Sequence, residues 1–133
     1  MANQIINTLN APAPIGPYSQ AVKTGNLLFI SGQVALVPGS DNMITDNISD
    51  ETHQVMKNLQ AILHEAGINF SNVVKTTIFL SDMGLFTAMN EIYGQYFGAA
   101  TGAENVGYPA RETIAVKGLP KNANVEISMI ASI

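Results

Sequence analysis

The stretch Val73-Val74-Lys75-Thr76-Thr77-Ile78-Phe79-Leu80 decides the fold that we expect. β-Branched residues dominate this stretch, and such residues favour β-strands. Apolar side chains occupy both sets of alternating positions, which is typical of a strand that is covered on both faces. Lys75 is the exception and is expected nearer an edge or an interface. We therefore predict a central strand over Val73–Leu80.

Two amphipathic helices are expected, one before this strand and one after it. In the first helix, apolar residues recur with helical spacing from Val55 to Ala66. Ser49 is its predicted N-cap and Gly67 its predicted stop. The second helix is expected to begin at Ser81 or Asp82. Its apolar stripe consists of Leu85, Phe86, Met89, Ile92, Tyr93, Tyr96 and Phe97.

Further strands are expected at Ala21–Lys23, Leu27–Ser31, Glu112–Lys117 and Asn124–Ile133. The order of elements is then hairpin, helix, strand, helix, strand, strand. This order predicts an α+β fold, a mixed β-sheet with two helices packed on one face. No repeat or linker interrupts the sequence, so one domain spanning residues 1–133 is predicted.

The composition predicts an oligomer. Charged residues make up only 12% of the 133 residues, whereas apolar types reach 47%, and soluble domains usually carry about 25% charged residues. A small monomer has too much surface to cover so sparsely with charge. No third helix is predicted for the second face of the sheet. We therefore expect neighbouring subunits to cover that face.

Several classes of function are disfavoured. The chain has no cysteine, which excludes disulfides and a thiolate nucleophile. His53 and His64 are too few for a metal site, and both are expected at the surface. A net charge of −4 without a basic run argues against nucleic-acid binding. The N-terminus lacks the pattern of a secretory signal, and no apolar run approaches the roughly 20 residues of a membrane helix. A cytoplasmic protein is expected.

Arg111 and Glu126 are the candidate chemical groups. Arg111 follows Tyr108-Pro109-Ala110 at the expected entry to a strand, and its guanidinium suits bidentate binding of a carboxylate. The alternative is an ordinary strand-end arginine in a surface ion pair. Glu126 lies between Val125 and Ile127, where a partly buried carboxyl group could have a raised pKa and carry protons. The alternative is a solvent-facing glutamate on the wet face of an amphipathic strand.

Tyr18 and Ser31 stand beside turn-forming residues. Tyr18 follows Gly16-Pro17, which is mainly a turn signal, and Ser31-Gly32 could simply end a strand. No histidine or lysine is evident beside Ser31 to act as a base. The residues alone therefore give little support to a serine nucleophile.

Over essentially its full length the chain resembles the RidA/YjgF family of reactive-intermediate deaminases. The matching stretches occur in the family's order. They are Ala13–Ala21, Leu28–Gln33, Asn72–Leu80 with Asp82-Met83, Met89–Tyr93, Tyr108–Thr113, and Gly118–Lys121 followed by Val125-Glu126-Ile127.

This resemblance implies a chorismate-mutase-like fold and a homotrimer with ligand clefts between subunits. It implies hydrolysis of 2-imino acids, or their enamine tautomers, to 2-oxo acids and ammonia, with no metal or cofactor. The family's cleft arginine corresponds to Arg111, which would anchor the substrate carboxylate, and its cleft glutamate to Glu126, which would handle protons and water. The other cleft residues correspond to Tyr18, Ser31, Gly32 and Asn90.

The glycine-rich stretch Gly98–Gly107 precedes Tyr108 and is expected to edge the cleft and to influence substrate preference. Two further functions are compatible with the resemblance. The first is a non-catalytic trimer that senses small 2-oxo acids through Arg111. The second is RNA cleavage, which an acidic chain with no histidine beside Arg111 makes a poorer fit.

Overall fold

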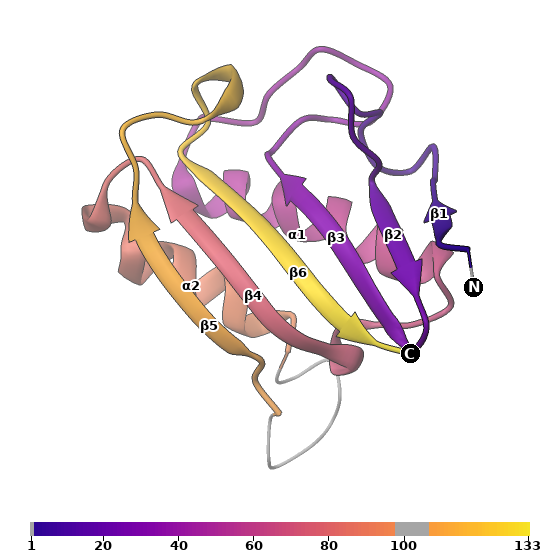
Figure 1. Cartoon of the computed structure of the whole chain (residues 1–133). Helices are drawn as coiled ribbons and strands as arrows, with labels where there is room; N and C mark the ends of the chain where they lie inside the picture. Colours follow the sequence, from indigo (N-terminus) through magenta and orange to yellow (C-terminus); the bar gives the residue numbers. More distant parts are fainter. Residues whose placement is uncertain (1, 98–106) are drawn as a thin grey trace.

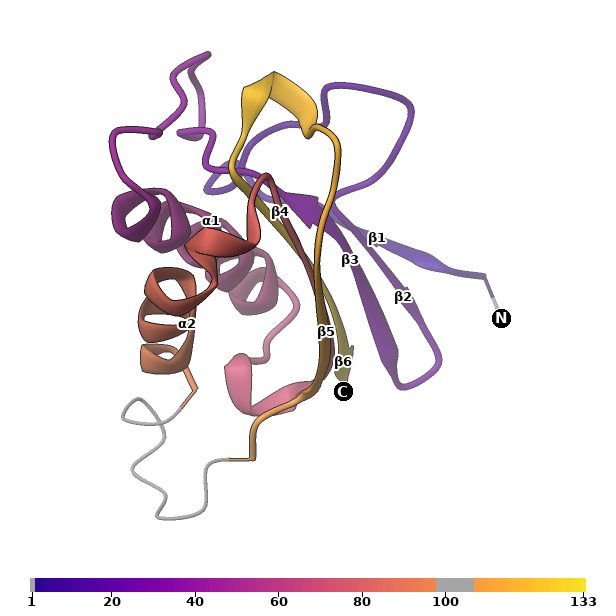
Figure 2. The same cartoon turned by 90° about the vertical axis from the view of Figure 1, so that its left-hand side faces the viewer.

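The computed structural model describes residues 2–97 and 107–133. One layer is a twisted six-stranded sheet and the other is a pair of helices (Figures 1 and 2). The helices are α1 (Ile48–Glu65) and α2 (Phe86–Gln95). The strands are β1 (Gln4–Ile6), β2 (Ala21–Thr24), β3 (Leu27–Gln33), β4 (Val73–Leu80), β5 (Ala110–Ala115) and β6 (Val125–Ser132).

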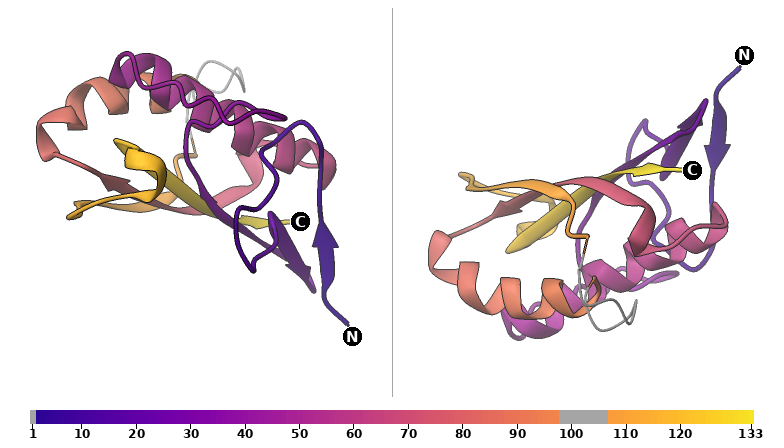
Figure 3. Two further views of the ribbon diagram at one scale, coloured as in Figure 1. Left: turned by 90° about the horizontal axis from the view of Figure 1, so that it is seen from above. Right: turned by 90° about the horizontal axis from the view of Figure 1, so that it is seen from below.

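The strands lie in the order β1-β2-β3-β6-β4-β5. Only β4 and β5 are parallel, and the other neighbours are antiparallel. The last strand, β6, is inserted between β3 and β4 and brings both halves of the chain together. Views from above and below show both helices on the same side of the sheet (Figure 3). The predicted α+β fold with a mixed sheet is confirmed.

The core lies between the helices and the sheet. Each fully buried aliphatic side chain contributes roughly 1.5–3 kcal/mol, so this layer stabilises the packing of α1 on the sheet. Its fully buried members from α1 and the sheet include Val55, Met56, Leu59, Ile62, Leu63, Leu28, Ile78, Leu80, Val125 and Ile127. The predicted stop of the first helix is confirmed, because Gly67 has φ of +78° and takes the left-handed conformation that favours glycine.

The predicted N-cap of α1 is wrong by two residues. Asn47, not Ser49, has the extended backbone of a cap, and its Oδ1 accepts a hydrogen bond of 2.8 Å from the amide of Asp50. Ser49 already lies within the helix. Both residue types cap helices well, so spacing alone did not separate them.

Several strand boundaries differ from expectation by one or two residues, and one strand was not predicted. β5 begins at Ala110 rather than Glu112, because it pairs in parallel with β4 from Lys75↔Ala110 onward. Arg111 therefore lies inside the strand rather than at its entry. The short strand β1 was not predicted, and it exists only because it pairs with β2 at the edge of the sheet.

The start of the second helix is more gradual than predicted. Asp82 does act as a cap, but it caps a 3-10 turn (Met83–Leu85) that leads into α2 at Phe86. The surface assignment of His53 is wrong. Its ring is partly buried, and Nδ1 lies 2.9 Å from the hydroxyl of Tyr96 between the helices. His64 is exposed, as expected.

The second face of the sheet has no helix over it in the described ranges (Figure 2). β4 accordingly buries Val73, Thr76, Ile78 and Leu80 on the helix side only. Within one chain, β4 is therefore covered on one face only, whereas cover on both faces was predicted. The expected loop at Gly98–Gly107 falls outside the described residues except for Gly107. No helix in the described ranges is long and apolar enough to cross a membrane.

Two candidate half-sites on opposite faces of the sheet

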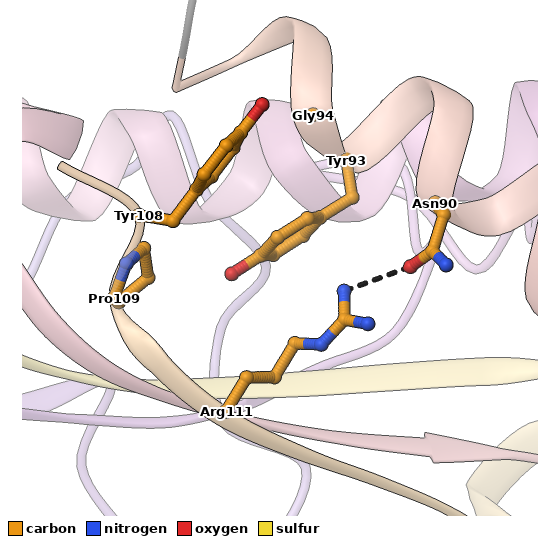
Figure 4. Close-up of a pocket in the computed structure, with 6 residues that line it drawn as sticks. All are labelled: Asn90, Tyr93, Gly94, Tyr108, Pro109 and Arg111. Carbon is orange, nitrogen blue, oxygen red and sulfur yellow. Dashed lines mark hydrogen bonds between the residues drawn. The ribbon is translucent and has the colours of Figure 1, made fainter. Parts of the chain in front are cut away.

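Arg111 forms the centre of the first half-site, on the helix side of the sheet. It is paired with Thr76 of β4, whose hydroxyl bonds to Tyr93 of α2, so Arg111 also points toward α2. Its Nη1 donates a hydrogen bond of 2.8 Å to Oδ1 of Asn90 (Figure 4). The guanidinium carbon lies 5.1 Å from the ring centroid of Tyr93 and 5.5 Å from that of Phe86.

These contacts hold the guanidinium in one orientation. Cation–π contacts with two rings and one amide hydrogen bond restrict a side chain that is otherwise long and mobile. Among the described residues, Asn90 is the only hydrogen-bond partner of this group. The other guanidinium N–H groups can therefore serve an anionic ligand.

A cavity of about 310 Å³ adjoins the guanidinium. It is lined by Asn90, Tyr93, Gly94, Tyr108, Pro109 and Arg111 (Figure 4). Burial raises the pKa of Tyr93, and the hydrogen bond between its hydroxyl and that of Thr76 and the charge of Arg111 offset part of that rise. Tyr93 thus stays a neutral phenol that supports the arginine. The sequence interpretation did not assign Tyr93 or Tyr108 to the site, although Tyr93 lies one helical turn from Asn90.

Glu126 forms the centre of the second half-site, on the open face of the sheet. It is half-buried in β6 and is paired with Phe79 of β4. The carboxyl group lines a second cavity of about 310 Å³ together with Ile15, Tyr18, Ser31, Gly32 and Pro120. Burial raises the pKa of Glu126 above the ordinary glutamate value. Glu126 is therefore only partly exposed in a single chain, although it lies on the open face of the sheet, as the alternative expected.

A β-bulge brings Gly32 against Glu126. Between Ile30↔Met129 and Gln33↔Ile127, β3 has one residue more than β6, and such a bulge re-aims the local side chains. A Cβ built on Gly32 would lie 2.8 Å from both Cδ and Oε2 of Glu126. The position therefore requires glycine for the carboxyl group to lie where it does.

Tyr18 and Ser31 complete the wall of this half-site. The amide of Ile15 donates a hydrogen bond of 3.2 Å to the hydroxyl of Tyr18. The hydroxyl of Ser31 donates one of 2.6 Å to the carbonyl of Ser19. Within residues 2–97 and 107–133, the hydrogen bond of the Ser31 hydroxyl goes to this backbone carbonyl and not to a basic side chain. The same ranges contain no group of three acidic or histidine side chains that could hold a metal ion.

The predicted site residues therefore fall into two groups. Arg111 and Asn90 lie together on the helix side, and Tyr18, Ser31, Gly32 and Glu126 lie together on the open face. The two groups are not brought together within one chain. The pairing register explains this, because Arg111 shares the face of Thr76 and Glu126 shares that of Phe79, which point to opposite sides of β4.

The architecture and the cavities define an α+β protein with one mixed sheet, two helices on one face and two recesses of the size that small molecules occupy. A family model described as endoribonuclease L-PSP matches residues 8–133. The crystal structure of YyfA from Yersinia pestis, of the conserved Rid protein family, is 40% identical with a TM-score of 0.91, and the match covers 99% of this chain and 100% of that one. The chain belongs to the RidA/YjgF family.

Two relatives with curated names illustrate the range within this family. RutC family protein PH0854 of Pyrococcus horikoshii is 45% identical over 128 residues, which is 96% of each chain. The 2-iminobutanoate/2-iminopropanoate deaminase of Homo sapiens is 40% identical over 131 residues, which is 98% of this chain and 90% of the human protein. The predicted family membership is confirmed.

Proposed function

We propose that this protein hydrolyses 2-imino acids, or their enamine tautomers, to 2-oxo acids and ammonia. The observation that carries the proposal is the Arg111 guanidinium, held by Asn90 and Tyr93 at the wall of a small cavity with N–H groups to spare. Relatives named as deaminases act, by those names, on 2-iminobutanoate and 2-iminopropanoate. Each of these substrates carries a single carboxylate beside the C=N bond.

Arg111 is proposed to bind that carboxylate. A guanidinium presents two parallel N–H groups that match both carboxylate oxygens, which sets the direction of the substrate as well as its position. Orientation matters here because the reacting carbon is the one next to the carboxylate. A substrate fixed by its carboxylate presents the C=N bond in a single place.

Glu126 is proposed to move the protons. Water adds to the imine carbon, the C–N bond breaks, and ammonia leaves as the carbonyl forms. A protonated imine carbon is already electrophilic, so the reaction needs a positioned water and a proton carrier rather than a covalent nucleophile. Burial raises the pKa of Glu126 above the ordinary glutamate value, and a carboxyl group with a raised pKa can both hold and release a proton more readily during the reaction. Tyr18 and Ser31 would supply walls and hydrogen-bond partners.

A site with both groups requires more than one subunit. Arg111 and Glu126 point to opposite faces of one chain, so we place the complete site between the helix-side half-site of one subunit and the open-face half-site of its neighbour. The open face supports an interface, because Phe29 and Ile114 on it are 43% and 49% exposed in a single chain. The number of subunits, a homotrimer, follows from the family resemblance.

The direct test is turnover of freshly generated 2-iminobutanoate. The purified protein is expected to form 2-oxobutanoate faster than the spontaneous hydrolysis in buffer. Binding of 2-oxobutanoate without acceleration would instead favour a non-catalytic sensor that uses the same arginine. A ribonuclease assay on the same preparation addresses RNA cleavage, the activity in the description of the family model.

A further inference from the structure

Glu51 is a fully buried carboxyl group that the proposed reaction does not use. It lies in the first turn of α1 and is 0% exposed. Its hydrogen bonds reach across to the start of β6. Oε2 accepts from the amides of Asn124 at 2.6 Å and Val125 at 3.3 Å, and Oε1 accepts from Nδ2 of Asn124 at 2.9 Å.

This carboxyl group has only neutral N–H partners. In the part of the chain that the structure describes, the one ion pair joins Lys75 to Glu112, so no lysine or arginine is paired with Glu51. A buried carboxyl group is unfavourable unless its oxygens are bonded. Since both oxygens of Glu51 accept bonds from one short segment, the group fixes the position of that segment and also its orientation.

Asn124 links the same segment to the end of β4. Its Oδ1 accepts a hydrogen bond of 2.9 Å from the hydroxyl of Ser81, and its carbonyl accepts one of 3.0 Å from the Ser81 amide. Asn124 is therefore held from two sides, by Glu51 on the helix layer and by Ser81 on the sheet.

The segment held in this way leads directly to Glu126, two residues after Asn124. Before it, Lys121 and Asn122 both have φ of 55°, a left-handed conformation that non-glycine residues rarely adopt. Such a turn persists only when its surroundings hold it in place. Pro120, at the start of this turn, lines the same cavity as Glu126. The Glu126 carboxyl group packs closely over Gly32, where an added Cβ would lie 2.8 Å from it.

We propose that Glu51 is a positioning residue for the Glu126 half-site. It sets the start of β6, and so the place of the Glu126 carboxyl group and of the Pro120 wall, from the far side of the sheet without touching the substrate. The inference rests on the proposed function only for its effect on turnover, because the positioning itself can be measured separately.

Side-chain length should matter more than charge at this position. Glu51→Asp keeps the carboxyl group but withdraws it by about 1.5 Å, the length of one C–C bond, so it cannot reach the amides of Asn124 and Val125. Glu51→Gln keeps the reach. The side-chain oxygen of the new glutamine can accept from the backbone amides of Asn124 and Val125. Its NH2 group is a donor, so the side-chain amide of Asn124 must rotate and present its oxygen to this group. The NH2 group of Asn124 then faces the Ser81 hydroxyl, which can accept a hydrogen bond as well as donate one.

The kinetic test compares these two variants with Glu65→Asp, the same change at an exposed position of α1. We expect Glu51→Asp to lower kcat by about tenfold to a hundredfold with KM within about twofold, since a displacement of 1 Å can cost that much while Arg111 is untouched. Glu51→Gln should stay within about threefold of wild type, and Glu65→Asp should change nothing. A kcat of Glu51→Asp equal to wild type, or equal losses in the Asp and Gln variants, would overturn the proposal.

A carboxyl-detected NMR titration of Glu126 tests the positioning without any turnover. The signal can be assigned by its loss in Glu126→Gln. Glu51→Asp should shift this signal and bring the pKa of Glu126 closer to the ordinary glutamate value, whereas Glu51→Gln should leave both as in wild type. An unchanged titration in folded Glu51→Asp would refute the positioning role even if the protein is an active deaminase. Absence of turnover in wild type would refute the proposed function alone.

Discussion

Arg111 and Glu126 lie on opposite faces of one sheet, although both belong to the predicted site. Arg111 is in register with Thr76, which faces α2, and Glu126 is in register with Phe79 on the open face. One chain therefore cannot present both groups to one small substrate. Either the two half-sites act independently, or they meet across a subunit boundary.

Mixed assemblies can decide between these arrangements. If each site takes Arg111 from one subunit and Glu126 from the next, a trimer of Arg111→Ala and Glu126→Gln subunits retains one intact site. Random assembly of equal amounts should restore about a quarter of wild-type activity, because about three quarters of the trimers are mixed and each has one good site in three. The measurement is turnover after joint refolding. Activity no greater than that of the separate variants would show that the site is not shared in this way.

The proposed oligomer should depend on the open face of the sheet. Phe29→Glu puts a charge on the exposed open face, which is the proposed interface, and should lower the sedimentation coefficient toward that of a single 14.1 kDa chain. Gln60→Glu, which adds the same charge on the exposed side of α1, should leave the assembly intact. A wild-type protein that sediments as a stable monomer at micromolar concentration would remove the idea of a trimer.

Arg111→Ala should abolish detectable deamination while the protein stays folded. A charged hydrogen bond contributes roughly 1.5–3 kcal/mol, and each 1.4 kcal/mol is about a factor of ten, so the loss should be at least about tenfold in kcat/KM. Arg111→Lys keeps the charge but loses the planar fork and should remain clearly impaired. Equal activity of the Lys variant would mean that only the charge matters. Equal activity of the Ala variant would place the site elsewhere.

Glu126→Gln should lower turnover by about a hundredfold or more while leaving binding of 2-oxo acids largely intact, because it keeps shape and hydrogen bonding but cannot carry a proton.

The raised pKa of Glu126 also predicts a pH effect on stability. A carboxyl group whose pKa is higher in the folded state stabilises the fold while protonated, and this contribution is lost as pH rises from the ordinary value of 4.5 through the folded value. The melting temperature of Glu126→Gln minus that of wild type should therefore increase as pH rises across this range. A constant difference would show that the pKa is not raised.

Gly32→Ala should impair turnover more than stability. The new Cβ would come within 2.8 Å of the Glu126 carboxyl group, and the flexible end of that side chain can move away at a cost of about 1 kcal/mol. We expect turnover to fall by about tenfold, since the displaced group is the proposed proton carrier, with little change in melting temperature. Gly118→Ala, where an added Cβ meets nothing within 4 Å, is the matched control. Equal activity of both variants would argue against a role for the carboxyl group at its present place.

The sequence by itself determined the elements whose pattern is local. Val73–Leu80 is a strand at both of its predicted ends, and the apolar spacing of α1 and the alternation along β6 are as predicted. These patterns are readable because each is produced by a period of about two or 3.6 residues within one segment. The family resemblance also singled out Arg111 and Glu126 as candidate groups for the proposed reaction.

Only the tertiary structure decided which groups lie together. The face that Arg111 or Glu126 occupies depends on pairing registers between strands far apart in sequence, and a shift of one residue would reverse it. The start of β5 at Ala110 and the presence of β1 likewise depend on neighbouring strands. The reach of Glu51 from α1 to Asn124, 73 residues later, leaves no periodic trace. Such contacts arise from packing of distant segments, and local spacing carries no information about them.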